Sequence, residues 1–222
     1  MHYLTSTNDH GLRHDPFKAI VSPRPIGWIA SVGADGGYNL APYSFFNAVS
    51  DDPYMVMFAS SGAKDTLSNV QRSGEFTCSL ATFDMVRAMN LSSAAVRPEV
   101  DEFALAGLTP APSLAIQAPR VAQSPVALEC RVWQCITLPS PQRSKHGQST
   151  VVFGEVVAVY IDESVLNDGR IDMNALQPVA RLGYMDYAVV NAANLFTQNR
   201  PSVSDDGLHA VLDDKPWDGV YR

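Results

Sequence analysis

The chain has little of what disulfide-rich, zinc-binding or membrane proteins need. It holds three cysteines in 222 residues, Cys78, Cys130 and Cys135, with no Cys-x-x-Cys spacing, so we expect free buried thiols rather than a disulfide framework. No apolar run approaches the roughly 20 residues that span a bilayer, so we expect no membrane association. Residues 1–10 contain neither a basic nor an apolar stretch. We therefore expect no signal peptide and a cytoplasmic location.

Positive charge is scarce as well. Sixteen Lys and Arg stand against 23 Asp and Glu, which gives a formal net charge of −7. Binding to duplex nucleic acid needs clustered Lys and Arg, so we expect no nucleic-acid partner. The negative net charge does not exclude an anionic cofactor, because one local pocket of hydrogen-bond donors can hold a phosphate on an acidic protein.

Several catalytic motifs are missing too. The chain has no Gly-x-Ser-x-Gly nucleophile elbow, no His-Glu-x-x-His zinc motif and no Gly-x-Gly-x-x-Gly dinucleotide fingerprint. His10 and His14 are four residues apart in a polar leader without a third ligand nearby, which is typical of surface histidines rather than of a metal site. We expect no acid–base triad, no metal and no Rossmann-type NAD site.

Short apolar, β-branched runs bounded by turn residues recur along most of the chain. They predict strands at 26–32, 38–46, 54–59, 75–80, 126–138 and 150–161, and helices at 65–72, at 82–89 and around 101–105. The Asp-Gly-Gly turn at 35–37 predicts a hairpin between the first two strands. Thr82 is the expected N-cap of the second helix. Alternation in 126–138 predicts one shared face for Leu128, Cys130, Val132, Ile136 and Leu138.

Many strands with few helices favour an antiparallel sheet that closes on itself, a mainly β fold. Without a repeat or a break in composition, we expect one domain over 1–222 that ends in a C-terminal arm at 199–222. The arm carries Trp217 and Tyr221, so it is either disordered or docked through these aromatics. The polar stretch 139–148 predicts a surface loop.

Two segments suit a ligand. Pro42 lies inside an apolar run, where it cannot donate a ladder hydrogen bond, so its strand is expected to be an edge or irregular there. Such an edge exposes peptide groups to a planar, hydrogen-bonding ligand, although a hairpin with a bulge explains the same residues.

Residues 60–66 bring hydroxyls, a glycine and a lysine to a helix start. These groups hold phosphates, but an ordinary helix capped by Asp65 or Thr66 is the alternative.

Taken together, these segments resemble the flavin reductase-like family of the FMN-binding split-barrel superfamily. The resemblance covers about residues 15–190 and is carried by SPRPIGWIAS, NLAPYSFFN, DDPYMVMFASS, KDTLSN, VDEFALAGLTP, FGEVVAVYIDE and PVARLGYMDY. It implies a six-stranded Greek-key split β-barrel, working as a homodimer with FMN near the subunit interface. Two positions depart from the family pattern: Tyr160 replaces the His of an HxDE motif, and Tyr184 replaces the last Gly of RLGG, where it would narrow the space for nicotinamide.

The resemblance also implies the cofactor-binding residues. By this resemblance, five residues would lie along the isoalloxazine ring and the ribityl chain of FMN: Ala41, Pro42, Tyr43, Ser44 and Asn47. Five more would hold the ribityl chain and the phosphate: Ser60, Ser61, Lys64, Asp65 and Thr66. The neighbouring strand would complete this side of the binding site with Ile29, Ala30 and Ser31, and the later part of the chain would approach the flavin with Arg181, Gly183, Tyr184 and Tyr187.

The implied activity is that of an FMN-dependent NAD(P)H oxidoreductase of the flavin reductase type. Such an enzyme passes reducing equivalents to free flavin or to a partner monooxygenase, and the cofactor rather than a protein side chain carries the hydride chemistry. Two alternatives stay open. One is an FMN-binding electron-transfer protein with little NAD(P)H activity, and the other is a β-barrel interaction module without flavin.

Overall fold

The computed structural model describes residues 1–139, 147–213 and 215–220. The chain forms two compact units, Met1–Val190 and Asn191–Arg222. The second unit contains the 3₁₀ turn η3 (Ala192–Asn194) and a two-stranded ribbon of β15 (Ser202–Val203) and β16 (Ala210–Val211). The indole of Trp217 donates to the carbonyl of Val220 at 3.0 Å within this unit. Tyr221 and most of the expected 139–148 loop lie outside the described residues.

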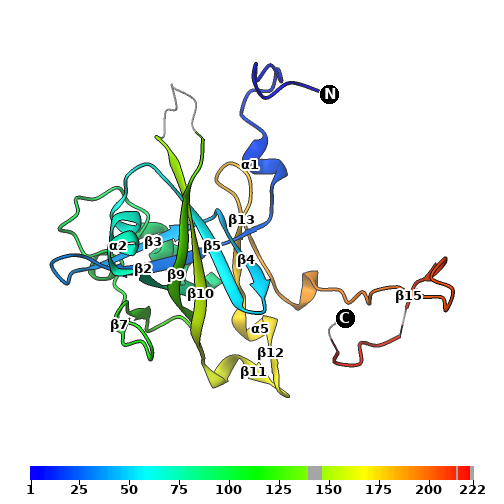
Figure 1. Ribbon diagram of the computed structural model, residues 1–222. Coiled ribbons are helices and arrows are strands. Elements are labelled where there is room, and N and C mark those ends of the chain that lie inside the picture. The colour runs from blue at the N-terminus through cyan, green and yellow to red at the C-terminus, as the bar shows by residue number, and fades with distance from the viewer. Residues whose placement is uncertain (140–146, 214, 221–222) are drawn as a thin grey trace. The chain divides into compact units, whose positions relative to one another are not determined.

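The first unit is built on one antiparallel sheet (Figure 1). Its strands are β2 (Gly27–Val32), β3 (Tyr38–Tyr43), β4 (Phe46–Asp51), β5 (Tyr54–Ser61), β6 (Glu75–Leu80), β9 (Val126–Thr137) and β10 (Ser149–Ile161). They lie in the order β3-β2-β6-β9-β10-β5-β4. The β2–β3 hairpin is confirmed, and so are the predicted strands at 26–32, 54–59, 75–80, 126–138 and 150–161.

The sheet has to curl, because its two edge strands are consecutive in the chain. Only Ser44 and Phe45 separate the end of β3 from the start of β4. Three Cα–Cα steps reach at most about 11 Å, whereas seven strands laid flat would put these edges about 29 Å apart. The contact between β3 and β5, which are far apart in the strand order, agrees with this closure.

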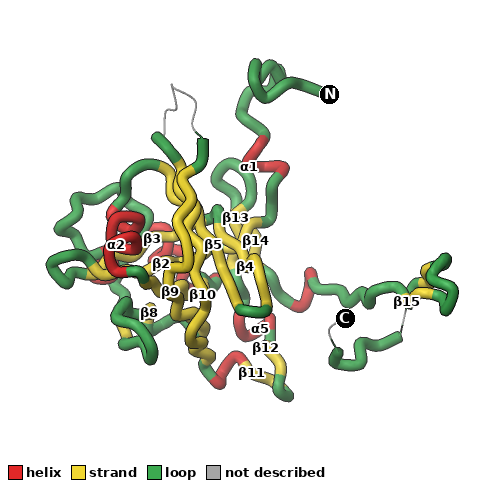
Figure 2. The backbone as a smooth tube through the Cα atoms, viewed as in Figure 1, coloured by secondary structure: helices red, strands yellow, loops and turns green. Residues whose placement is uncertain are grey.

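Short elements surround the sheet (Figure 2). The helices are α1 (Phe17–Ile20), α2 (Asp65–Ser73), α3 (Val86–Leu91), α4 (Glu102–Leu105) and α5 (Met173–Leu176), with 3₁₀ turns η1 (Phe83–Met85) and η2 (Glu163–Val165). A second sheet has the order β1 (Arg24–Pro25), β13 (Val179–Arg181), β14 (Tyr187–Val189). Two ribbons pair β7 (Pro110–Ala111) with β8 (Arg120–Val121), and β11 (Leu166–Asn167) with β12 (Arg170–Ile171).

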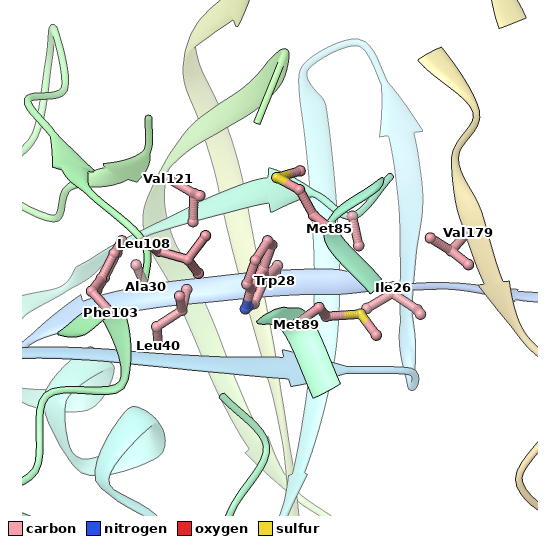
Figure 3. Close-up of a cluster of buried hydrophobic side chains, with 11 residues drawn as sticks. Ile26, Trp28, Ala30, Leu40, Met85, Met89, Phe103, Leu108, Val121 and Val179 are labelled. Carbon is pink, nitrogen blue, oxygen red and sulfur yellow. The ribbon is translucent and has the colours of Figure 1, made fainter. Parts of the chain in front are cut away.

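Strand β2 is buried on both faces, so it separates two cores. Successive side chains of a strand point to opposite faces, and Trp28 and Ala30 accordingly lie in one cluster with Met85 and Met89 (Figure 3). Ile29 lies in the other cluster, which contains Tyr43, Val56, Phe58, Leu67, Val70, Phe76, Cys78, Cys130 and Val152. Cys78 and Cys130 are free and buried, as expected, while Cys135 is free and half-buried.

Helix α2 forms where the sequence predicts it. Leu67 and Val70 are three residues apart and pack into the second core, which is the spacing of one helical face. Gly74 ends the helix with φ of 74° and donates its N–H to the carbonyl of Val70 at 2.9 Å. A left-handed C-cap of this kind favours glycine.

Two local predictions are wrong and a third is right in part. The run 38–46 is two strands, which gives the main sheet seven strands among the described residues instead of six. The predicted helix at 82–89 is confirmed in position with Thr82 as its N-cap residue, but its first turn is the 3₁₀ turn η1, followed by α3, and the Thr82 side chain makes no capping bond. The pairing of β9 with β10 shifts by one residue at Trp133. Such a shift turns the later side chains to the other face, so Ile136 and Leu138 are exposed and Cys135 packs inward.

Phe58 is a sensitive position of the second core, because it is fully buried against the rings of Tyr43 and Phe76, at centroid distances of 4.8 and 5.2 Å. We expect Phe58→Ala to lower the free energy of unfolding by about 3–5 kcal/mol. The matched control Phe83→Ala removes a ring that is 51% exposed and should cost about 0.5 kcal/mol or less. Urea denaturation of both variants measures this, and equal losses would contradict the assignment of Phe58 to the core.

Candidate functional site

Two adjoining cavities lie beside the edge strand β3. The first has a volume of about 470 Å³ and the second about 290 Å³, and Pro42 and Ser93 line both. Around the first are Asn39, Ala41, Tyr43, Ala63, Lys64, Asp65, Thr66, Ser92, Ala94, Ala95, Val96, Pro98 and Glu102. Around the second are Ile26, Ser44, Met89, Asn90, Arg181, Met185 and Tyr187.

The strand that forms the common wall is an edge strand, as Pro42 predicts. β3 pairs with β2 on one side and, in the described part of the chain, with no strand on the other. Across the cavity, the segment after α3 is anchored to the core. The Trp28 indole donates to the Ser92 hydroxyl at 2.9 Å, and that hydroxyl donates to the carbonyl of Met89 at 2.8 Å. The opening beside β3 is therefore bounded on this side by a segment that is hydrogen-bonded to the core.

The start of α2 points free backbone donors at the first cavity. The capping position is Lys64, and no side chain caps the helix. The alternative of a helix capped by Asp65 or Thr66 is therefore wrong, and the Thr66 hydroxyl instead donates to Oδ1 of Asn39 at 2.6 Å. The N–H groups of residues 65–67 have no acceptor among the described residues. Together with the helix dipole, such donors favour an anion.

Two buried hydroxyls beside this helix start lack a partner. Tyr43 Oη and Ser60 Oγ make no hydrogen bond of normal geometry within the described residues, although the Thr66 and Ser60 hydroxyls lie close enough to Tyr43 Oη to lower its pKa against the larger rise from burial. A buried polar group without a well-formed hydrogen bond costs about 1–3 kcal/mol. Burial raises the pKa of the Tyr43 phenol, which therefore stays protonated and can donate. The Lys64 ammonium lies 5.8 Å from the centre of the Tyr43 ring. One lysine, two hydroxyls and three N–H groups thus gather at one end of the site.

A buried polar network supports the floor of the first cavity. Oε2 of Glu102 accepts from Nδ2 of Asn39 at 3.1 Å and from the backbone N–H of Leu40 at 3.0 Å. The Ser31 hydroxyl donates to Oδ1 of Asn39 at 3.3 Å and accepts from Nδ2 of Asn69 at 3.3 Å. Burial raises the pKa of Glu102, and the bonds from Leu40 and Asn39 oppose that rise.

The structure brings together part of the predicted residue set. The first cavity is lined by the predicted Ala41, Pro42, Tyr43, Lys64, Asp65 and Thr66, and the second by Pro42, Ser44, Arg181 and Tyr187. Ser60 lies fully buried on β5 and carries one of the unpaired hydroxyls.

The other predicted residues line neither cavity. Ile29 and Ala30 are fully buried in the two cores, and Ser31 is fully buried in the network of Asn39. Ser61 shares a hydroxyl–hydroxyl bond of 3.1 Å with Ser149. Asn47 is exposed on β4, and Tyr184 is exposed and packs edge-on against His14. Gly183 is buried so close to Ala19 that a Cβ would approach the Ala19 Cα to 2.6 Å.

Sequence reasoning missed several residues around the cavities. Asn39 and Glu102 lie within the segments NLAPYSFFN and VDEFALAGLTP, but the hydrogen bond between them joins positions 63 residues apart. Residues 92–98 follow no periodic pattern, so no signal marked them. In the described part of the chain there is no cluster of three metal-ligating side chains and no helix long and apolar enough to cross a membrane.

Known proteins share this architecture. The model of the family described as "Flavin reductase like domain" matches residues 21–190. Three solved structures are similar to the chain. Nitrilotriacetate monooxygenase component B from Bacillus cereus is 28% identical with a TM-score of 0.78, over 89% of this chain and 98% of that one.

The other two structures extend the likeness. The 2-nitrobenzoate 2-nitroreductase NbaA of Pseudomonas fluorescens is 29% identical with a TM-score of 0.75, over 89% of this chain and 95% of that one. Flavoredoxin of Desulfovibrio vulgaris (Miyazaki F) is 25% identical with a TM-score of 0.69, over 82% of this chain and 92% of that one. The family resemblance and the mainly β, split-barrel fold expected from the sequence are confirmed.

The raised pKa of Glu102 predicts a pH effect on stability. As pH rises above the ordinary value of 4.5, the unfolded chain loses this proton first while the folded chain keeps it, so the contribution of Glu102 to folding falls until the pH passes its folded pKa. Glu102→Gln keeps an acceptor for Leu40 and removes the titration. We expect the free energy of unfolding of Glu102→Gln, relative to that of the native chain, to increase as the pH rises from the ordinary value of 4.5 to the folded pKa of Glu102.

Denaturant unfolding between pH 4 and pH 7 measures the effect, with the exposed Glu99→Gln as the matched control. The control should follow the native chain at every pH. A difference between Glu102→Gln and the native chain that stays constant with pH would contradict the burial of an ionisable carboxyl at this position.

Proposed function

Since the chain belongs to the flavin reductase-like family, we propose that it is an FMN-dependent NAD(P)H oxidoreductase of the flavin reductase type. The family supports an oxidoreductase role and a flavin cofactor in general terms. The identity of the flavin, its reductant and its acceptor belong to the proposal.

The observation that carries the proposal is the set of unsatisfied donors at the Lys64 end of the first cavity. FMN ends in a ribityl chain with hydroxyls and a phosphate. The Lys64 ammonium and the free N–H groups at the start of α2 suit the phosphate. The unpaired hydroxyls of Tyr43 and Ser60 suit the ribityl oxygens. The residues present therefore fit FMN.

The isoalloxazine ring would lie along β3 from Ala41 to Ser44. The outer edge of this strand offers peptide groups to a planar heterocycle, and Pro42 marks a position with no N–H to satisfy. The ring end would then meet the second cavity, because Pro42 lines both. Ile29, Ala30 and Ser31 contribute by supporting β3 from the neighbouring strand. Asn47, Ser61, Gly183 and Tyr184 remain predictions of contact with the cofactor from the family resemblance.

FMN, when bound, supplies the hydride and electron chemistry. The chain contributes binding, orientation and shielding of the ring. The network of Asn39 and Glu102 holds β3 against the start of α2, so it positions both ends of the cofactor. The high pKa of Tyr43 keeps its phenol as a donor rather than an anion beside a phosphate.

The proposal includes partners and location. Similarity to a monooxygenase component B supports a partner monooxygenase, or free flavin, as acceptor. We also propose a cytoplasmic homodimer. Trp133 is 65% exposed and packs edge-on against Phe153, on the long strands β9 and β10. An exposed tryptophan on a sheet is a typical interface anchor.

An electron carrier is the second candidate, favoured by the similarity to a flavoredoxin. Tyr184 lies in the hairpin between β13 and β14, next to Met185, which lines the second cavity. A bulky residue there restricts the approach of a nicotinamide ring. In this case the chain would accept electrons from a protein and react slowly with NAD(P)H.

The absorbance spectrum of the purified protein distinguishes these functions. We expect flavin bands, after reconstitution with FMN if needed, that bleach on anaerobic addition of NADPH or NADH. Bands that persist with both nucleotides would favour the electron carrier. A preparation that stays colourless and does not take up FMN would contradict both.

Lys64→Ala tests the phosphate end. Loss of a charge-assisted contact should cost about 1.5–3 kcal/mol, which weakens FMN binding about 10- to 150-fold. Lys64→Met keeps the aliphatic stem and should lose a similar amount, and Arg87→Ala, which removes an exposed cation on α3, is the control. Fluorescence titration of the apoprotein with FMN gives the dissociation constants. Unchanged affinity in both Lys64 variants would refute the assignment.

A further inference from the structure

The second cavity has two chemically different sides. Its volume of about 290 Å³ is at the lower limit of pockets for small organic ligands. Ile26, Pro42, Met89 and Met185 give it an apolar side. Ser44, Asn90, Ser93, Tyr187 and Arg181 supply polar groups. A flat, single-ring molecule with one polar substituent matches this lining, whereas a dinucleotide is too large to be enclosed.

Arg181 is held in place by three contacts and has N–H groups that remain without an acceptor. Its Nη1 donates to the Tyr187 hydroxyl, and its Nη2 donates to the Tyr184 carbonyl at 2.5 Å and contacts the Met185 sulfur at 3.3 Å. The guanidinium also lies 4.6 Å from the centre of the Tyr187 ring. An arginine carries five N–H groups. The Nε–H and one Nη1–H therefore have no acceptor among the described residues.

The charge on Arg181 is not neutralised by the protein. Arg24 is its direct partner in the β1–β13 pair, and no carboxylate forms an ion pair with either arginine in the described part of the chain. The nearest acids along the chain do not help. The Asp15 carboxylate accepts from the backbone N–H of Phe17 at 2.9 Å, and neither it nor the Asp186 carboxylate forms an ion pair with Arg24 or Arg181 in the described residues.

Arg24 adds to the positive potential around Arg181, and its own guanidinium is hydrogen-bonded to backbone carbonyl groups. It is buried, and it donates to the carbonyls of Lys18, Val21 and Leu182. Burial, and then the charge of Arg181, lower the pKa of Arg24. Lys18 and Arg24 both lie about 6 Å from the centre of the Phe45 ring. Three cations thus gather here, although the chain carries a net charge of −7.

We propose that the second cavity binds a single-ring aromatic carboxylate, and that Arg181 selects it by binding the carboxylate. This inference rests on the proposed function, because FMN supplies the neighbouring ring face. FMN has one phosphate, which the Lys64 end satisfies, so the Arg181 end remains for the anionic group of a second ligand. Charge-assisted bonds from a pre-oriented guanidinium are strong and directional. The aromatic ring packs between the apolar side of the cavity and Tyr187.

The test compares benzoate with benzamide, which has the same shape and no charge. Each is titrated into the FMN-loaded protein, and binding is followed by the shift of the flavin absorbance bands. We expect benzoate to bind at least about tenfold more tightly than benzamide in the native protein. Arg181→Gln should bring the two affinities within about threefold of each other. Arg87→Gln, at an exposed position of α3 that does not line the cavity, should keep the preference.

A second measurement uses the native protein alone, in case Arg181→Gln folds poorly. The affinity for benzoate should fall as salt rises from low to physiological concentration, and the affinity for benzamide should not change. Equal affinities for the two compounds, or a preference that survives in Arg181→Gln, would overturn the proposal. A rise in the KM for NADPH or NADH in Arg181→Gln without a native preference for benzoate would overturn it too, and would assign Arg181 to the reductant.

The outcomes also separate this inference from the proposed function. If Arg181→Gln loses FMN, the residue belongs to the cofactor site, and the second-ligand proposal fails while the flavin proposal stands. If the native protein binds no FMN at all, the proposed function fails, and benzoate binding to the apoprotein by calorimetry then decides the role of Arg181 independently.

Discussion

The structure depends on the two residues that join its edge strands. Ser44 and Phe45 connect β3 to β4, which lie at opposite ends of a seven-stranded order. The chain is too short there to cross a flat sheet, so the sheet rolls up until its edges meet. β3 and β4 are nevertheless not hydrogen-bonded to each other. The closure therefore leaves an open strand edge beside a well-packed core, and both cavities border on that edge.

The polar groups around the cavities follow from the same closure. β2 is buried on both faces and positions β3, while α2 follows β5 and packs Leu67 and Val70 into the second core. The start of α2 consequently lies against the open edge, where Thr66 and Asn39 bond. On the other side, Arg24 ties α1 to the β13–β14 hairpin through the Leu182 carbonyl. The two cationic ends of the site are thus held by different parts of the chain.

Much of the fold could be predicted from the sequence, because strands and helices leave local periodic signals. The strand at 75–80 and the helix that ends at Gly74 were predicted in this way. The break at Ser44 was not, since the apolar run continues across it and only sheet closure interrupts the strand. The shift at Trp133 was missed for a related reason. One extra residue changes the face of every later side chain, but it leaves the composition of the strand unchanged.

The residues that line the first cavity could be predicted where they lie close together in the chain. Lys64, Asp65 and Thr66 stand at a strand–helix junction, where the physical chemistry of helix starts applies directly. Glu102 was not predicted, because its partner Asn39 is 63 residues away in the chain. Arg181 was predicted through the family resemblance alone, and its position beside Arg24 on the neighbouring strand depends on the closed fold.

The buried hydroxyls of Tyr43 and Ser60 that lack a well-formed hydrogen bond make the folded chain less stable without a ligand than with one. Their desolvation is unfavourable in the native state alone, since water satisfies the same groups in the unfolded chain. A ligand that binds only the native state raises the unfolding free energy by RT ln(1 + [L]/Kd). The supply of cofactor would then govern how long each newly made copy persists against proteolysis, so abundance of the protein would track availability of its ligand.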